Sequence, residues 1–306
     1  MDFAAATVIP VNGESTEDVL VDKDGRIYTG LLDGRIVRVS DEGRVIETIG
    51  RCPGRPLGLE FYGDDELVVC ASDAGLLAMS IADGTVRTLA DKAFDAPIIA
   101  CNNAAVAADG TVYFSDSSRR FPIPEWRRDI VEQTRTGRLL RLNTDGTVDE
   151  LLGGLHFANG VALAADESFV TVAESGGCQV RRVWFTGPHA GTSEVFLADL
   201  DFYPDNSSTG SDGLIWIALA SRKVAALDVV QRMPALLRST VLQLPKFVQP
   251  APARTVGTIA VNEAGEIVHS YDGEIDGFQM LTGVRERDGV LYFGSLHESS
   301  VVVMAR

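Results

Sequence analysis

One tight hairpin pattern recurs along the whole chain and restricts the folds that it can adopt. Each copy has an alternating apolar stretch, a turn of Asp or Glu with Gly, and a second β-rich stretch. Such a turn supplies the residue of positive φ that a tight hairpin needs, and the flanks have the period of a strand. The copies read VLVDKDGRIYTG from Val19, LEFYGDDELVVCAS from Leu59, VAADGTVYFSD from Val106, VALAADESFVTVAES from Val161, GSDGLIWIALAS from Gly210, IAVNEAGEIVHSY from Ile259 and VRERDGVLYFGS from Val284.

Several copies are followed by a second apolar pair, so that two hairpins make one four-stranded unit. The second pairs read GRIVRVS from Gly34, GLLAMS from Gly75 and GRLLRLN from Gly137. Repeats of ~40 residues with four strands each are typical of a propeller, whose ring closure protects sheet edges from aggregation. The sequence therefore predicts an all-β fold, a six-bladed β-propeller with short helical insertions.

The count of six depends on the last third of the chain. We treat residues 259–271 as the outer hairpin of blade five, displaced by an insertion; if they formed their own blade, the ring would have seven. A strand at residues 6–11 would complete the last blade, so that both ends of the chain close one ring. We expect residues 1–306 to form a single domain, with blades that begin near Glu17, Pro56, Cys101, Ala158, Pro204 and Met280.

Two segments interrupt the repeat. Residues 119–136, RRFPIPEWRRDIVEQTRT, predict a loop and a short helix, and residues 220–250 carry apolar residues at helical spacing with a proline interruption. Long insertions in compact folds often act as lids or binding loops. Helical decoration packed on one face of the propeller is an equally open interpretation.

Charge and cysteine content exclude several classes of partner. The formal net charge of −16 and the absence of a Lys/Arg-rich run argue against nucleic acid. The chain has neither a basic flank before a long apolar run at its N-terminus nor ~18 consecutive apolar residues, so we expect a cytoplasmic protein without a membrane span. The 4 cysteines form no C-x-x-C pair, which favours buried free thiols over zinc or disulfides. The oligomeric state stays open.

Oxygen-bearing residues stand where innermost strands should begin, while serine-hydrolase, zinc-protease and dinucleotide signatures are missing. These residues are Glu17, Asn102, Asn159 and Asp205. Because innermost strands line the channel of a propeller, the four side chains could meet at one mouth. Oxygen donors with two carboxylates suit a hard cation such as Ca²⁺. The alternative is that each residue satisfies backbone groups near its own turn.

Four long motifs resemble the strictosidine-synthase-like branch of the superfamily that contains gluconolactonases, regucalcin and paraoxonases. They are YFSDSSRRFPIPEWRRDIVEQTRTGRLLRLN, GLHFANGVALAADESFVTVAES, VRRVWFTGPHAGTSEVF and YPDN, in the family's order. The resemblance implies a six-bladed propeller and, in hydrolytic members, a divalent metal, usually calcium, at the channel mouth. The metal ligands that it implies here are Glu17, Asn102, Asn159 and Asp205, with Asn206 as a further contact.

The chain departs from the family pattern at three places. Thr282 stands where the alkaloid-forming synthases have the Glu of their Pictet–Spengler condensation, so this reaction is not expected. Leu57, between Pro56 and Gly58, replaces the His of paraoxonases. Asn103 replaces an Asp of many relatives, which predicts weaker metal binding.

Together, the residues and the resemblance predict a hydrolase of small-molecule lactones or of aryl or alkyl esters. Ca²⁺, or another divalent metal, would polarise the carbonyl and activate water. Asp205 or Glu17 would take the proton from water, with His156 as an alternative base. The apolar residues of the 220–250 insertion favour a hydrophobic substrate over a sugar lactone. Two alternatives stay open: a non-catalytic binding module with a structural metal, and a metal-independent enzyme.

Overall fold

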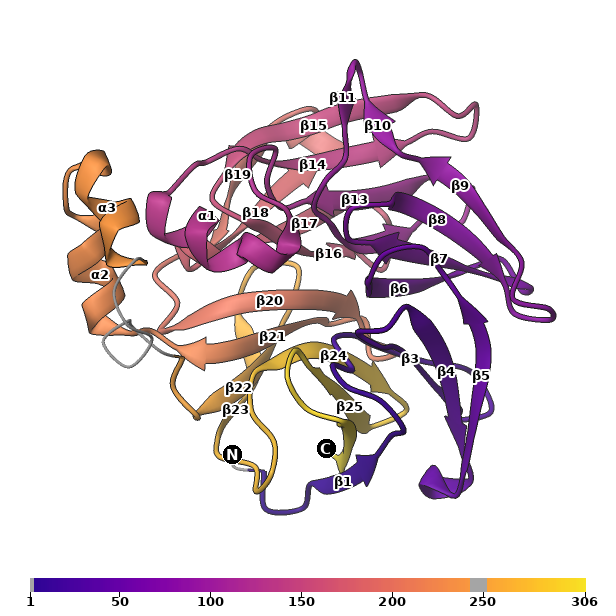
Figure 1. The fold of residues 1–306 in the computed structure, drawn as a ribbon. Coiled ribbons are helices and arrows are strands. Elements are labelled where there is room, and N and C mark those ends of the chain that lie inside the picture. Colours follow the sequence, from indigo (N-terminus) through magenta and orange to yellow (C-terminus); the bar gives the residue numbers. More distant parts are fainter. Residues whose placement is uncertain (1–2, 243–251) are drawn as a thin grey trace.

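Six four-stranded antiparallel sheets surround a central axis in the computed structural model, which describes residues 3–242 and 252–306 (Figure 1). Blade one contains β2 (Val19–Val21), β3 (Ile27–Gly30), β4 (Arg35–Ser40) and β5 (Val45–Arg51). Blade two contains β6 (Pro56–Tyr62), β7 (Glu66–Ala71), β8 (Gly75–Ser80) and β9 (Val86–Ala90). Blade three contains β12 (Cys101–Val106), β13 (Val112–Asp116), β14 (Gly137–Leu142) and β15 (Val148–Leu155).

The other half of the ring repeats this order. Blade four contains β16 (Ala158–Leu163), β17 (Phe169–Glu174), β18 (Gln179–Trp184) and β19 (Ser193–Leu197). Blade five contains β20 (Phe202–Thr209), β21 (Ile215–Arg222), β22 (Val256–Val261) and β23 (Ile267–Gly273). Blade six contains β24 (Leu281–Arg287), β25 (Val290–Ser295), β26 (Ser300–Ala305) and β1 (Thr7–Pro10). The predicted six-bladed propeller is confirmed, because β22 and β23 complete blade five and form no blade of their own.

The N-terminal strand closes the ring. β1 pairs antiparallel with β26, with Thr7 opposite Val303 and Pro10 opposite Ser300. Both ends of the chain therefore lie in blade six, and Figure 1 shows them close together beside β1. Because the last strand comes from the opposite end of the sequence, the ring cannot open without breaking this pairing.

Apolar layers between neighbouring blades form the core. Leu20, Tyr28 and Ile36 of blade one pack with Leu59 and Leu67 of blade two in one such layer. Trp216, on β21, is fully buried in the corresponding layer between blades five and six. The alternation seen in the sequence thus buries both faces of most strands, as expected for sheets stacked around an axis.

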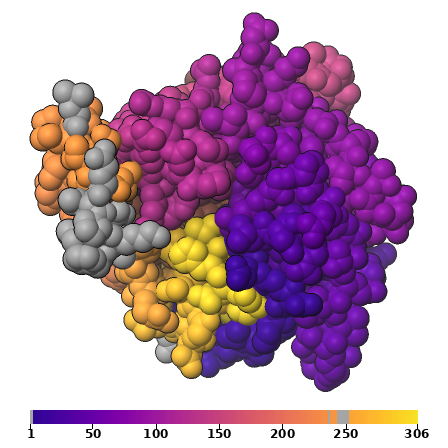
Figure 2. Space-filling view, in the orientation of Figure 1, coloured from indigo at the N-terminus to yellow at the C-terminus, as the bar shows by residue number. Residues whose placement is uncertain are grey.

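Helices occur in both segments that interrupt the repeat. α1 (Trp126–Glu132) follows the short helix η2 (Ile123–Glu125), and α2 (Ala225–Gln231) and α3 (Ala235–Val241) follow β21. Both α2 and α3 pack against α1, and Figure 2 shows them as an orange mass beside the magenta surface that contains α1. Residues 243–250 of the predicted insertion lie outside the described residues. The remaining elements are η1 (Asp41–Gly43), η3 (Ser175–Gly177), η4 (Gly187–His189) and the small hairpin of β10 (Lys92–Ala93) and β11 (Ala96–Pro97).

Side chains tie these helices together. Gln231 donates from Nε2 to the carbonyl oxygen of Ile130 at 3.1 Å, and Arg238 donates to the carbonyl oxygen of Glu132 at 3.1 Å. Carbonyls in the last turn of α1 therefore find donors on the other helices. Among the described residues, no helix is both long and apolar enough to cross a membrane. The four cysteines are buried and form no disulfide.

Candidate metal centre

Four of the five predicted ligands lie where the innermost strands of blades three, four and five are irregular, and Glu17 lies two residues before β2. Asn102 is the second residue of β12, and Asn159 is the second residue of β16. The pairing of β12 with β13 shifts between Cys101 and Ala104, and β16 and β20 shift at the corresponding places. Such bulges turn side chains away from the regular alternation of a strand. The ladder therefore breaks where the amides must be aimed at the channel mouth.

Glycines let neighbouring innermost strands approach closely at this mouth. A Cβ at Gly58 would lie 2.6 Å from the carbonyl oxygen of Asn102 and 2.7 Å from Cα of Asn103. A Cβ at Gly283 would lie 2.8 Å from Cα of Asp18. Any larger residue would push blade two away from blade three, or blade six away from blade one. The spacing between the candidate ligands thus depends on these glycines.

One cavity collects the four residues that the sequence singled out. Glu17, Asn102, Asn159 and Asp205 all line it, together with apolar side chains from the helices and loops. The apolar part of the lining includes Leu57, Ile123, Trp126, Ile130, Val131, Phe157, Leu227, Met280 and Leu296. We call Glu17, Asn102, Asn159 and Asp205 the floor of the cavity and its apolar side chains the walls. A mostly apolar lining with a few polar groups is the usual composition of a small-molecule site.

Three amide oxygens near the cavity floor are buried and have no partner among the described residues. Asn102 donates from Nδ2 to Ser117 Oγ at 2.9 Å, Asn159 to Ser175 Oγ at 3.0 Å, and Asn206 to Glu17 Oε2 at 3.2 Å. The nitrogen of each amide thus donates to a neighbouring side chain, and each Oδ1 is left without a hydrogen bond. A buried carbonyl oxygen without a partner costs free energy, so three together require a donor or a cation.

The hydrogen bonds around Ser175 fix the orientation of one of these amides. Its hydroxyl donates to the carbonyl oxygen of Pro204 at 2.6 Å, so it can only accept from Asn159. The carboxylate of Glu17 likewise can only accept from Asn206. In both cases the nitrogen faces the partner and the buried oxygen has no partner, so the atoms left to coordinate a cation are oxygen atoms.

Two carboxylates stand beside these oxygens. Burial raises the pKa of the Glu17 carboxyl well above its usual range, and the nearby charges of Asp205 and Asp18 raise it further. Burial also raises the pKa of Asp205, which is only half-buried by exposed area, to about 7. Like charges that are held together away from water stabilise a bound cation, which would lower both pKa values. The residues present therefore fit a hard divalent metal.

The described residues contain no group of three or more His, Cys, Asp or Glu side chains that could hold a metal. The candidate centre differs from such a group because three of its five donors are amides: Asn102, Asn159 and Asn206. Amide oxygens are ordinary ligands of calcium and poor ligands of zinc or copper. The donor chemistry thus favours calcium.

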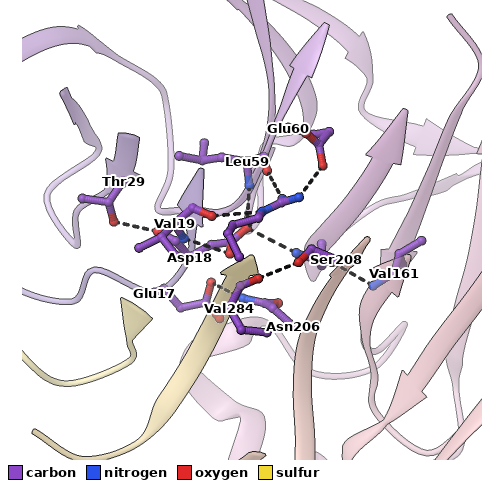
Figure 3. A network of polar contacts seen from close by, with 12 residues as sticks. Glu17, Asp18, Val19, Thr29, Leu59, Glu60, Val161, Asn206, Ser208 and Val284 are labelled. Carbon is purple, nitrogen blue, oxygen red and sulfur yellow. Dashed lines mark hydrogen bonds and ion pairs between the residues drawn. The ribbon is translucent and has the colours of Figure 1, made fainter. Parts of the chain in front are cut away.

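A second polar network, which sequence reasoning missed, lies next to this centre (Figure 3). Arg285 donates to the carbonyl oxygen of Val19 at 3.0 Å, to that of Leu59 at 2.8 Å and to Glu60 at 2.7 Å. Asp18 accepts from the backbone N–H of Leu59 at 3.0 Å and lies 3.8 Å from Arg285. One arginine of blade six therefore holds the inner edges of blades one and two.

Asn103 belongs to this network, and its contacts require both the oxygen and the nitrogen of an amide. Its Oδ1 accepts from the backbone N–H of Val161 at 2.7 Å, and its Nδ2 approaches Asp18 Oδ2 at 3.4 Å. An aspartate at this position could not donate to Asp18 and would repel it. The expected weakening of metal binding by Asn103 stays a prediction, but the structure gives the residue a role in joining blades.

The other positions that the sequence singled out have clear places. Thr282 donates from Oγ1 to the carbonyl oxygen of Glu17 at 2.7 Å, so it supports the backbone of a candidate ligand. Leu57 adds to the apolar wall of the cavity. His156 is buried, with Nε2 at 3.3 Å from the carbonyl oxygen of Ile130 in α1, and it is not part of the cavity lining among the described residues.

The position of His156 predicts a pH effect on stability. Burial lowers its pKa from 6.5 to about 4. Between about pH 6.5 and pH 4, His156 is protonated in the unfolded chain but neutral in the folded protein. The free energy of unfolding therefore decreases as the pH falls from about 6.5 toward 4. We expect the difference in free energy of unfolding between the His156→Gln variant and the wild type to change by ~2 kcal/mol between pH 7 and pH 5 in urea titrations. An unchanged difference would show that His156 titrates normally.

The fold and the cavity define a six-bladed propeller with an oxygen-rich candidate cation centre at the channel mouth. Residues 102–188 match the family model of strictosidine synthase, and residues 2–39 match the N-terminal model of strictosidine synthase-like proteins. The chain is 32% identical over 326 residues to protein strictosidine synthase-like 10 of Arabidopsis thaliana, covering 96% of this chain and 86% of that protein. The chain therefore belongs to the strictosidine synthase-like family.

Further relatives and structures extend this likeness. The chain is 30% identical over 297 residues to the adipocyte plasma membrane-associated protein of Rattus norvegicus, covering 88% of this chain and 77% of that protein. A gluconolactonase of Xanthomonas campestris superposes with a TM-score of 0.70 at 13% identity, covering 98% of this chain and 89% of that one. The calcium-binding protein regucalcin of Agrobacterium tumefaciens superposes with a TM-score of 0.64 at 16% identity, covering 97% and 95%. At these identities the structural likeness shows the fold.

Proposed function

We propose that the protein is a calcium-dependent hydrolase of hydrophobic lactones or of aryl or alkyl esters. The observation that carries the proposal is a set of three unpartnered amide oxygens beside two carboxylates: Asn102 and Asn159 line an apolar cavity with Glu17 and Asp205, and Asn206 contacts Glu17. The structural likeness to a gluconolactonase and to a calcium-binding regucalcin supports the same proposal. Glu17, Asn102, Asn159, Asp205 and Asn206 would hold the ion.

The chain's own residues supply the rest of the site. A bound divalent cation would supply positive charge that polarises a substrate carbonyl and stabilises the negative charge that develops on its oxygen. The apolar walls, with Trp126 and Ile130 from α1 and Leu227 from α2, would bind the organic part of the substrate and keep bulk water out. No covalent nucleophile is needed, since water can attack directly.

Asp205 is our choice for the group that takes the proton from water. It is less buried than Glu17, it lines the cavity, and burial raises its pKa to about 7. Both carboxylates accept a hydrogen bond from Asn206, Glu17 from its side chain at 3.2 Å and Asp205 from its backbone N–H at 3.0 Å, so the choice rests on exposure. A carboxylate that can reach solvent fits general-base catalysis, although a bound cation would lower its pKa and so its basicity. His156, which contacts α1 and does not line the cavity, would have a structural role instead.

Metal analysis combined with a substrate panel tests the proposal. We expect one bound calcium per chain, together with hydrolysis of aliphatic lactones and aryl esters in preference to gluconolactone. Activity should disappear on chelation and return with calcium, because the buried carboxylates and amides need the cation to organise them. The measurements are elemental analysis of the purified protein and initial rates before and after chelation.

Other outcomes would replace the proposal. Hydrolysis that survives chelation would favour a metal-independent enzyme. A bound metal with no hydrolysis of any member of the panel would favour a binding module with a structural metal. A clear preference for gluconolactone would contradict the hydrophobic substrate class.

A further inference from the structure

A single arginine lines the cavity without a carboxylate partner among the residues that the structure describes. Arg127, on α1, contributes to the cavity wall. Its guanidinium lies over the ring of Trp126, 5.4 Å from the ring centre, and no ion pair with a described residue holds it. Most surface arginines of this protein form an ion pair with a carboxylate, as Arg38 does with Glu47 at 2.8 Å. Arg119, Arg135 and Arg232 also lack an ion pair with a described residue, but they are not part of the cavity lining, whereas Arg127 is.

The carboxylates nearest to Arg127 in sequence already have other partners. Arg128, the next residue, donates to Glu132 at 2.8 Å and to Glu125 at 3.2 Å. Asp129 is buried and accepts from Ser118 and Thr134. The charges of α1 thus balance on its outer side, whereas Arg127 keeps a free guanidinium on the side of the cavity.

A second arginine makes the same region more positive. Arg55 lies near the charges of Glu17 and Asp205, but among the described residues it makes a hydrogen bond only to Ser15, and its Nε is buried without a partner there. Partial burial lowers the pKa of His297, the charge of Glu298 opposes this shift, and the charges of Arg127 and Arg55 add to it, so both arginines lie near His297.

The charge balance favours an anion at this mouth. A divalent cation would offset the two carboxylate charges of Glu17 and Asp205, and neither Arg55 nor Arg127 has an ion pair with a carboxylate among the described residues. The rest of the molecule does not share this character, since the chain has a net charge of −16. A positive mouth on an acidic protein attracts and orients anionic substrates. One accessible guanidinium next to an apolar wall suits a singly charged carboxylate, which it binds in a planar fork.

We propose that Arg127 binds the carboxylate of an amphipathic, anionic substrate, whose apolar chain lies against Trp126, Ile130 and Leu227 and whose ester or lactone carbonyl reaches the floor of the cavity. The inference rests on the proposed function for the carbonyl contact at the floor and for the cation that would offset the charges of Glu17 and Asp205. It makes Arg127 a specificity-determining residue, and it names the substrate class as lactones or esters that also carry a carboxylate.

Ligand binding tests this inference without turnover. Phenylbutyrate and its neutral amide, phenylbutyramide, have the same apolar body and differ in charge. On the calcium-loaded protein, titration calorimetry should show the acid binding about tenfold tighter than the amide, because only the acid can form charge-assisted hydrogen bonds with the guanidinium. In the Arg127→Gln variant the two ligands should bind equally, and Arg127→Lys should keep part of the preference.

Arg128→Gln is the matched control, since Arg128 stands next to Arg127 but pairs with Glu125 and Glu132 on the outer side of α1. It should leave the preference for the acid unchanged. Equal affinities of the acid and the amide for the wild type would overturn the inference. A preference that survives Arg127→Gln would overturn it too, because the carboxylate would then bind elsewhere, for example at the cation.

Turnover of two esters separates a failure of this inference from a failure of the proposed function. Nitrophenyl pentanoate ends in a methyl group where the nitrophenyl monoester of glutaric acid ends in a carboxylate. Hydrolysis of both esters with equal kcat/KM, unaffected by Arg127→Gln, would leave the proposed function standing and sink the role of Arg127. Hydrolysis of neither ester, together with an Arg127-dependent preference in calorimetry, would support the role of Arg127 and sink the proposed function.

Discussion

The Asp205→Asn variant is expected to lose on the order of 10²–10³-fold in kcat/KM toward an aryl ester, the loss typical of removing one group that stabilises a charged transition state. Asp205 lines the cavity and stands beside the buried carboxylate of Glu17. The substitution keeps the size of the side chain but removes a negative charge from the candidate cation centre and the proposed base. Initial rates at several calcium concentrations measure the effect.

Stability measurements give this prediction a second readout. Without calcium, Asp205→Asn should be at least as stable as the wild type, because it relieves repulsion with Glu17. At a calcium concentration of 100 Kd, the wild type should gain about 2.7 kcal/mol, and the variant should gain much less. Asp201→Asn is the matched control, since Asp201 is exposed and lies next to β20 in the same blade. Equal stabilisation of both proteins by calcium would place the cation elsewhere.

The Arg285→Met variant is expected to lose about 3–5 kcal/mol in free energy of unfolding, the cost of breaking a buried ion pair from one side. The side chain of Arg285 is 10% exposed and that of Asp18 is 1% exposed. Without the arginine, Asp18 loses its nearest positive charge, and Glu60 and the carbonyl oxygens of Val19 and Leu59 lose their donor. Urea unfolding at pH 8 measures the loss.

A double variant shows whether charge is the cause. Burial already raises the pKa of Asp18 to about 6, with Arg285 opposing the shift. Adding Asp18→Asn to Arg285→Met removes the stranded charge and should restore part of the lost stability. Arg287→Met is the control: Arg287 is 37% exposed, lies 3.7 Å from Asp288, and should matter by less than about 0.5 kcal/mol. If Arg285→Met and Arg287→Met lower the free energy of unfolding by the same amount, the buried network does not hold the inner strands together.

The sequence located the candidate ligands because they recur at one phase of the repeat. Asn102 and Asn159 each occupy the second position of an innermost strand, and Asp205 stands in the equivalent part of blade five. In a ring of similar blades, residues at one phase lie at one height around the axis. Strand periodicity and turn residues are local properties, so the blades and their starts could be read from short windows of sequence.

The inner network could not be read in this way. Asn103 and Asp18 are 85 residues apart, and Asn206 and Glu17 are 189 residues apart. Their partnerships depend on which strands the ring brings together and on which way each bulge turns a side chain. Asn103 looked like a lost carboxylate, whereas its contacts show an amide that joins Asp18 to the backbone of blade four. His156 looked like a candidate base, whereas α1 covers it.

By itself, the sequence determined the six blades, the closing strand from the N-terminus and the phase at which oxygen donors occur, because alternation, turn chemistry and repetition act over short distances. Only the tertiary structure decided which oxygens are left without partners, which carboxylates raise each other's pKa and which arginine faces the cavity. Those properties arise from burial and from contacts between blades, and neither exists until the ring has closed.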